Sequence, residues 1–224
     1  MGKTRLSAAL LRALAARGLP ALGLKPIETG IWGSNQSIVD AAASDATALI
    51  DASSVRTGIQ HHPLYALREP VSPHLAARRA GTQIELGLIA RWTDEAERSV
   101  TPHVTSSSAL WTVIETAGGV FSPLAPGTTN FDLAQTLGPA IWVLVAADAL
   151  GVLHDVSSCL QAMRACGREP DHLVLSAARD PDASTGSNSA ELEALGIAAP
   201  AALLARNDDR GVTQLLDRLL EVNP

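Results

Sequence analysis

Residues 110–119 have the sequence LWTVIETAGG, in which an apolar, β-rich run ends abruptly at Glu115 and is followed by a pair of glycines. A second run, AIWVLVA at residues 140–146, is apolar throughout. Strands that lack alternation of apolar and polar residues are covered on both faces, as they are in parallel sheets. These two stretches therefore predict a buried, mostly parallel sheet.

Helical segments alternate with strands along the chain, which implies right-handed β–α–β crossovers and an α/β fold with a doubly wound sheet. Ligands of such folds bind at the loops that follow strand ends. Loop-like sequence is concentrated at residues 34–79 and 180–189. We expect helices at residues 4–17, 45–51, 84–98, 131–137, 152–165, 191–195 and 214–222, and further strands at residues 21–25 and 172–176.

The composition of the 224 residues suits one domain with a sizeable core, since 46% are hydrophobic and 18% are charged. Only 3% are aromatic, which argues against a base-stacking surface for single-stranded nucleic acid. A net charge of −6 argues against a general binder of nucleic acid or of anionic membranes. Nucleic acid and membrane are therefore not expected partners.

Several features point to a cytoplasmic protein. The sequence has no stretch of about 18 apolar residues and no basic segment followed by an apolar run, so neither a membrane span nor a signal peptide is expected. Cys159 and Cys166 would lie about 10 Å apart on one helix, too far apart for a disulfide. Buried, reduced thiols are the simpler interpretation.

Gly2, Lys3 and Thr4 match the last three positions of a phosphate-binding loop, G-x-x-x-x-G-K-[ST], and lead directly into a helix. In such a loop, backbone N–H groups cradle the phosphates, the lysine reaches the β and γ phosphates, and the hydroxyl binds Mg²⁺. Three residues can match by chance, and a frayed terminus without a role is the alternative.

Glu115 stands at the tip of a buried strand, where a Walker-B type acid holds Mg²⁺ in phosphate-loop enzymes. The glycines that follow allow the backbone to approach a ligand closely. A solvated acid before a glycine turn explains the same residues equally well.

Lys25 ends the strand at residues 21–25, at the sheet edge where the phosphate loop would lie. It could neutralise charge on a transferring phosphoryl group, and Thr29 could bind the same substrate. The alternative is a surface lysine before a turn.

Two further segments carry weaker signals. Asp45 could be another Mg²⁺ ligand, although the pair Ser44 and Asp45 is equally suited to cap the following helix. Ser72 lies between two prolines that fix its loop, and it could contact a substrate or simply belong to a structural turn.

Together and in this order, these segments resemble the dethiobiotin synthetase family, over roughly the first 150 residues. That family has a phosphate loop ending in GKT and the segments KP-x-x-[ST]-G, SD, EP-x-SPH and E-x-AGG. The matching residues here are 2–4 (GKT), 25–30 (KPIETG), 44–45 (SD), 69–74 (EPVSPH), 115–124 (ETAGGVFSPL) and 147–154 (ADALGVLH).

The resemblance implies a phosphate-loop NTPase fold and an ATP- and Mg²⁺-dependent ligase. The substrate 7,8-diaminononanoate would be carboxylated by CO₂, the carbamate phosphorylated by ATP, and the ureido ring of dethiobiotin closed by the second amine. The family is a homodimer. The implied catalytic residues are Lys25 and Lys3, the nucleotide-binding residues Gly2, Lys3, Thr4, Asp45, Glu115, Thr116, Ala117 and Gly118, the substrate-binding residues Thr29 and Ser72, and the metal ligands Thr4, Asp45 and Glu115.

Two departures from the family pattern affect the nucleotide site. The resemblance places Met1 inside the phosphate loop, so we expect a single domain over residues 1–224 that lacks its first strand. That strand would lie between residues 21–25 and residues 110–115, and its absence is expected to weaken ATP binding. Residues 175–178 (LSAA) stand where the family has an adenine-contacting Asn-Asp pair.

Two other classes of function remain open from the sequence. One is an ATPase switch of the partition or septum-site type, which shares the fold but usually needs a membrane helix or a basic DNA surface. The other is a degenerate, non-catalytic relative that acts as a partner subunit.

Overall fold

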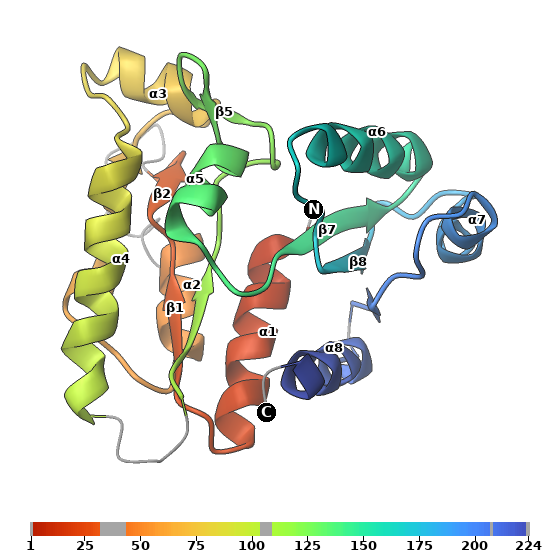
Figure 1. Ribbon diagram of the computed structural model, residues 1–224, viewed down its shortest axis with the longest axis horizontal. Helices are drawn as coiled ribbons and strands as arrows, with labels where there is room; N and C mark the ends of the chain where they lie inside the picture. Colours follow the sequence, from red (N-terminus) through yellow and green to blue (C-terminus); the bar gives the residue numbers. More distant parts are fainter. Residues whose placement is uncertain (1, 32–43, 104–108, 207, 223–224) are drawn as a thin grey trace. The chain divides into compact units, whose positions relative to one another are not determined.

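The computed structural model describes residues 2–31, 44–103, 109–206 and 208–222 (Figure 1). The chain divides into two compact units, which we call the N-terminal unit (residues 7–138) and the C-terminal unit (residues 1–6 and 139–224). In the described residues, no helix is long and apolar enough to cross a membrane. Both units combine parallel strands with helices, so the predicted α/β class is confirmed.

The elements of the N-terminal unit surround a parallel pair of strands, β1 and β4. Helix α1 begins in the C-terminal unit and continues here. The elements are α1 (Lys3–Ala16), β1 (Ala21–Leu24), β2 (Ile27–Thr29), α2 (Asp45–Ala52), the 3-10 helix η2 (Ile59–His61), β3 (Tyr65–Leu67), α3 (Pro73–Arg79), α4 (Leu86–Val100), the 3-10 helix η3 (Thr101–His103), β4 (Trp111–Ile114), β5 (Pro123–Ala125), β6 (Thr128–Thr129) and α5 (Asn130–Leu137).

Helix α4 covers one face of the β1–β4 pair (Figure 1). Leu22 and Leu24 of β1 form a buried cluster with Trp92 and Ala96 of α4. On the other face, Gly23 lies against α1 and α2. Strand β1 is therefore buried on both faces, as its apolar sequence predicts, and this packing positions its carboxyl end.

Gly23 is required by this close packing. A Cβ atom at residue 23 would lie 2.6 Å from Leu11 Cδ1 and 3.0 Å from Leu49 Cβ. We therefore expect Gly23→Ala to lower the free energy of unfolding by about 1–3 kcal/mol, as overpacked cores do. Denaturant titration would measure this. Gly58→Ala is the matched control, because residue 58 has open space and φ −61, and a destabilisation equal to that of Gly23→Ala would contradict the packing argument.

Strand β1 pairs directly with β4, from Ala21 opposite Trp111 to Leu24 opposite Ile114. The expectation that a missing strand separates these two segments is therefore wrong, because their shared ladder of hydrogen bonds leaves no place between them. Glu115 N–H extends the ladder by donating to Leu24 O at 2.9 Å.

Smaller sheets flank this pair. Strands β2 and β3 run parallel, with Thr29 opposite Leu67, and β5 and β6 form a short hairpin. Of the predicted loop at residues 34–79, residues 34–43 lie outside the described part of the chain. The rest contains α2, β3 and α3, which the sequence predicted only in part.

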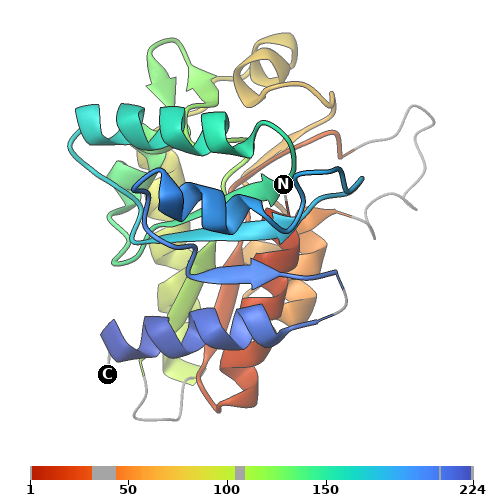
Figure 2. The same cartoon turned by 90° about the vertical axis from the view of Figure 1, so that its right-hand side faces the viewer.

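The C-terminal unit is a parallel sheet in the order β7-β8-β9, with helices packed against it (Figure 2). Helices α6 and α7 share one apolar cluster with β7 and β8, while α8 lies along β9, where Gly211 approaches Leu203 O. Cys159 and Cys166 are free thiols, but Cys159 is half-buried and Cys166 is exposed near the end of α6, so the expectation that both are buried is wrong. The elements are β7 (Val143–Asp148), α6 (Val152–Ala165), β8 (His172–Ala177), α7 (Asn188–Ala194), β9 (Ala202–Leu204) and α8 (Arg210–Val222).

Candidate active site

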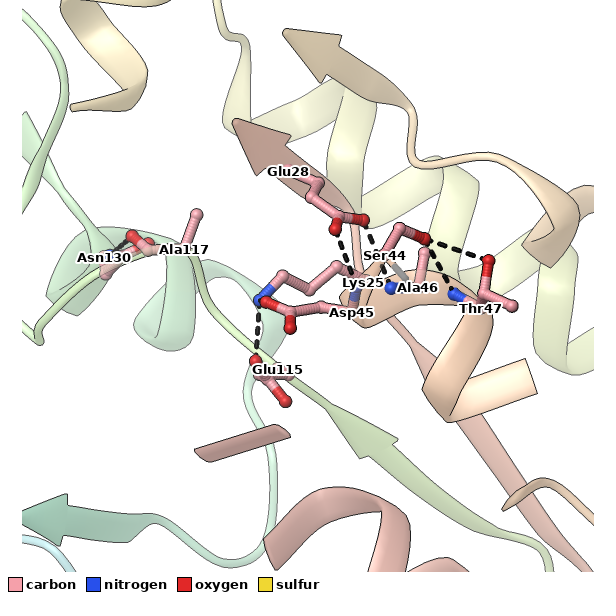
Figure 3. Close-up of polar contacts among 9 residues, drawn as sticks. All are labelled: Lys25, Glu28, Ser44, Asp45, Ala46, Thr47, Glu115, Ala117 and Asn130. Carbon is pink, nitrogen blue, oxygen red and sulfur yellow. Dashed lines mark hydrogen bonds and ion pairs between the residues drawn. The ribbon is translucent and has the colours of Figure 1, made fainter. Parts of the chain in front are cut away.

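Lys25 lies just after β1 and is 5% exposed, so it is not the surface lysine of the alternative interpretation. Its Nζ donates to Glu115 Oε1 at 2.6 Å and to Asp45 Oδ2 at 3.0 Å (Figure 3). Glu115, 4% exposed, follows β4, the strand paired with β1. Parallel pairing therefore brings the two buried side chains to the same sheet edge.

Lys25 remains a cation in this environment. Burial lowers the pKa of its ammonium group, but the charges of Glu115 and Asp45 and their hydrogen bonds outweigh burial and raise the pKa above its ordinary value. A protonated, desolvated ammonium group interacts strongly with negative charge, because little water screens it. The site therefore holds a fixed positive charge at neutral pH.

Helix α2 presents Asp45 to Lys25, and two side chains hold its first turn. Ser44 is the N-cap, and its Oγ accepts from Thr47 N at 3.0 Å. Glu28 of β2 accepts from the N–H groups of Asp45 at 2.7 Å and Ala46 at 3.1 Å (Figure 3). The capping role of this segment is confirmed, and it leaves the Asp45 carboxylate to contact Lys25.

Glu28 was not singled out by the sequence. Its carboxylate is buried, and burial raises its pKa above the ordinary value although the N–H groups of Ala46 and Asp45 act in the opposite direction. A negative group at the N-terminus of a helix is favourable for the helix dipole. No sequence rule joins Glu28 to a helix that begins 17 residues later, so only the fold could reveal this contact.

The loop after Glu115 belongs to the same unit. Ala117 is buried in an apolar cluster with Ile27 of β2 and Leu67 of β3. Gly118 has φ +85, which favours glycine, and a Cβ atom there would lie 2.6 Å from Ser122 Oγ. Thr116, which precedes Ala117, is half-buried.

Thr29 and Ser72 lie on neighbouring segments of the N-terminal unit. Thr29 ends β2, and a Cβ atom on the adjacent Gly30 would lie 3.1 Å from Pro70 Cβ. Ser72 precedes Pro73, the first residue of α3, and its Oγ lies 3.1 Å from His74 Nδ1. Proline suits this first helical position, so the structural turn accounts for the segment and a substrate contact of Ser72 stays a prediction.

Gly2, Lys3 and Thr4 belong to the C-terminal unit. Helix α1 begins at Lys3, and Gly2 O accepts from Leu6 N at 3.0 Å, so the residues from Gly2 onward form an ordered helix start. Gly2 has φ +80, and a Cβ atom there would lie 2.1 Å from Ser176 Oγ. Lys3 and Thr4 therefore occupy the first turn of a helix, as a phosphate loop requires.

We expect Gly2→Ala to weaken nucleotide binding, because the new methyl group would displace Ser176 and strain the helix start. Titration of a fluorescent ATP analogue would measure the affinity. Gly151→Ala is the matched control: Gly151 is also a helix N-cap at positive φ, 98°, but has open space around it. Equal affinities of the two variants would contradict a role of Gly2 at the nucleotide.

The carboxylates of Asp45 and Glu115 suit Mg²⁺, which takes oxygen ligands and usually one or two protein carboxylates together with substrate phosphates and water. Within the described part of the chain, no group of three or more His, Cys, Asp or Glu side chains could hold a metal alone. The donor set therefore fits Mg²⁺ that arrives with a nucleotide.

A family model described as an AAA domain matches residues 1–214. An ATP-dependent dethiobiotin synthetase of Anaeromyxobacter sp. (strain K) is 33% identical over 210 residues, which cover 93% of this chain and 86% of that protein. The chain belongs to the dethiobiotin synthetase family. A relative of the same name from Caulobacter sp. (strain K31) is 32% identical over 183 residues, which cover 81% of this chain and 74% of that protein.

Membership in the dethiobiotin synthetase family confirms the resemblance drawn from the sequence. It also confirms the assignment to ligases and to the phosphate-loop fold. The structure brings Lys25, Asp45 and Glu115 into contact within the N-terminal unit. The roles of the individual site residues stay predictions.

Proposed function

We propose that this protein is an ATP- and Mg²⁺-dependent ligase that converts 7,8-diaminononanoate and CO₂ into dethiobiotin, over a single domain of residues 1–224. The buried Lys25 ammonium, held by Glu115 and Asp45, carries the proposal. Such a cation suits a reaction in which negative charge develops on transferring oxygens. Family membership supplies the reaction class.

The proposed reaction proceeds in three balanced steps. An amine of the substrate adds to CO₂ and releases a proton, which gives a carbamate. A carbamate oxygen then takes the γ-phosphoryl group of ATP and releases ADP. The second amine attacks the carbamate carbon, loses a proton and expels phosphate, which closes the ring. One ADP and one phosphate are formed for each dethiobiotin.

Lys25 and Lys3 would stabilise negative charge on the phosphoryl group and the carbamate, since phosphoryl transfer depends on positioning and electrostatics more than on a covalent nucleophile. Gly2, Thr116, Ala117 and Gly118 would contact the nucleotide through their backbones. Bound Mg²⁺, held by Thr4, Asp45 and Glu115, would neutralise phosphate charge.

At the other end of the proposed site, Thr29 and Ser72 would contact the diamine. Thr29 follows Lys25 by four residues at the end of β2, and Ser72 lies on the segment next to it. We further propose a cytoplasmic homodimer, as the family resemblance implies.

Phosphate release that depends on the diamine tests this function. The protein would be incubated with ATP, Mg²⁺, bicarbonate and 7,8-diaminononanoate, with phosphate measured by a coupled assay and dethiobiotin by mass spectrometry. We expect equal amounts of the two products and no release without the diamine. Nucleotide hydrolysis that ignores the diamine would instead favour an ATPase switch, and binding without turnover would favour a non-catalytic relative.

A further inference from the structure

Asn130, the first residue of α5, binds through its side chain to the loop that follows Glu115. Asn130 is 1% exposed, and its Nδ2 donates to Ala117 O at 2.7 Å (Figure 3) and to Gly119 O at 2.9 Å. Both donor hydrogens of the amide are thus used on carbonyl groups of one short loop. The loop connects β4 to the hairpin of β5 and β6, so these bonds join segments that local structure alone would not fix.

The oxygen of the Asn130 amide lowers the stability of the fold. Asn130 Oδ1 is buried and has no hydrogen-bond partner among the described residues. A buried acceptor without a partner destabilises a fold unless another interaction offsets it. A helix can begin with many other residues, so capping does not require this side chain. The two bonds to the loop are what the buried amide provides.

Ser122 fixes the far end of the same loop. Gly119 N–H donates to Ser122 Oγ at 2.8 Å, and Ser122 N–H donates back to Gly119 O at 3.0 Å. Asn130 N–H in turn donates to Ser122 O at 3.2 Å. The carbonyl groups of Ala117 and Gly119 therefore face Asn130, and its side chain holds the peptide groups to which they belong.

We propose that Asn130 is a positioning residue for nucleotide binding, because it orients the backbone of residues 117–119, which follow Glu115. The proposal rests on the proposed function for the identity of the ligand, a nucleoside triphosphate. Asn130 does not contact the ligand itself. It acts by binding the carbonyl groups of Ala117 and Gly119. These bonds would keep the backbone of the loop in the orientation that contacts the phosphates.

Asn130→Asp tests the two donors with almost no change in shape. At neutral pH, the new carboxylate has no hydrogen to donate and repels both carbonyl oxygens. We expect the dissociation constant of a fluorescent ATP analogue to rise about tenfold or more. The dissociation constant describes the folded molecules only, so a purely structural loss would lower the unfolding midpoint and leave the constant unchanged.

The pH profile of Asn130→Asp provides a second readout. Burial raises the pKa of a carboxyl group, and a protonated carboxyl group can donate one hydrogen bond. The affinity of the variant relative to the wild type should therefore recover in part as the pH falls from about 8 to about 6. A ratio that stays constant across this range would show that hydrogen-bond donation at residue 130 is irrelevant.

Thr93→Val is the matched control, because Thr93 of α4 is also buried and its Oγ1 also has no hydrogen-bond partner among the described residues. We expect its nucleotide affinity to equal that of the wild type. If Asn130→Asp does not fold, the uncharged Asn130→Ser takes its place, since a hydroxyl group has one hydrogen to donate and cannot serve both carbonyl groups. Wild-type affinity in the folded Asn130 variant, or an equal loss in Thr93→Val, would overturn the proposal.

Wild-type activity separates this proposal from the proposed function. If the wild type forms dethiobiotin but the Asn130 variant binds the analogue normally, only the positioning role fails. If the wild type binds the analogue, loses affinity in the variant and forms no dethiobiotin, the positioning role holds and the proposed function fails. A wild type that binds no nucleotide would overturn both.

Discussion

Replacing Lys25 with glutamine is expected to lower turnover by about 10²-fold or more, the loss typical of one electrostatic group that acts mainly in the transition state. Glutamine keeps the length of the stem but carries no charge. The Lys25 ammonium group is buried and protonated between Glu115 and Asp45, so the variant loses a positive charge at a position that water screens little. Diamine-dependent phosphate release at saturating ATP would measure the loss.

The control for Lys25→Gln must separate chemistry from folding, because loss of one partner of a buried ion pair commonly destabilises a protein by about 3–5 kcal/mol. Circular dichroism and the unfolding midpoint would establish that the variant is folded at the assay temperature. Arg164→Gln, which removes an exposed ion pair with Glu169, should leave turnover unchanged. Turnover of folded Lys25→Gln within a few-fold of the wild type would refute the catalytic role.

Much of the fold could be predicted from the sequence because its strands and helices have simple hydrophobic patterns. The helix expected at residues 152–165 is α6 to the residue, and the strand expected at residues 21–25 is β1 without its last residue. Buried parallel strands and amphipathic helices differ clearly in period and in composition. The same reasoning missed β2, β3 and β9, which span only three residues each and carry no such period.

Boundaries were harder to predict than elements. The apolar run at residues 140–146 predicted a strand there, but β7 is Val143–Asp148. Trp142 N–H donates to Asp171 Oδ2 at 2.7 Å, a contact between side chain and backbone that the hydrophobic pattern does not encode. The strand then continues through Asp148, whose carboxylate is held by Gly186 and Asn188.

The candidate site shows the same division. Lys25, Asp45 and Glu115 could be predicted because each stands at the end of a strand or the start of a helix, within a short and recognisable motif. Glu28 and Asn130 could not, since their roles depend on backbone groups that lie 17–18 and 11–13 residues away in the sequence. Contacts of this kind exist only once the strands have paired.

Glu115→Gln is expected to weaken the apparent affinity for Mg²⁺ in the presence of ATP by at least about tenfold, since even outer partners of metal ligands commonly contribute this much. In the wild type, Glu115 Oε1 lies 2.6 Å from Lys25 Nζ. The amide of the variant keeps an oxygen that can accept from Lys25, but it lacks the negative charge that favours Mg²⁺. The change adds no heavy atoms at a site that is 4% exposed, but it removes the charge of one partner of a buried ion pair, so the unfolding midpoint must show that the variant is folded. Calorimetric titration with an ATP analogue at several Mg²⁺ concentrations would measure the affinity.

The matched control for Glu115→Gln is Asp148→Asn, because Asp148 also stands at the end of a parallel strand. Its oxygens accept from Gly186 N at 2.9 Å and from Asn188 Nδ2 at 2.7 Å, so it holds its own loop. We expect Asp148→Asn to lower stability without changing the Mg²⁺ dependence, since its carboxylate is already committed to that loop. If the two variants shift the Mg²⁺ dependence equally, or if Glu115→Gln shifts it not at all, then Glu115 serves only to hold Lys25 and is not a metal ligand.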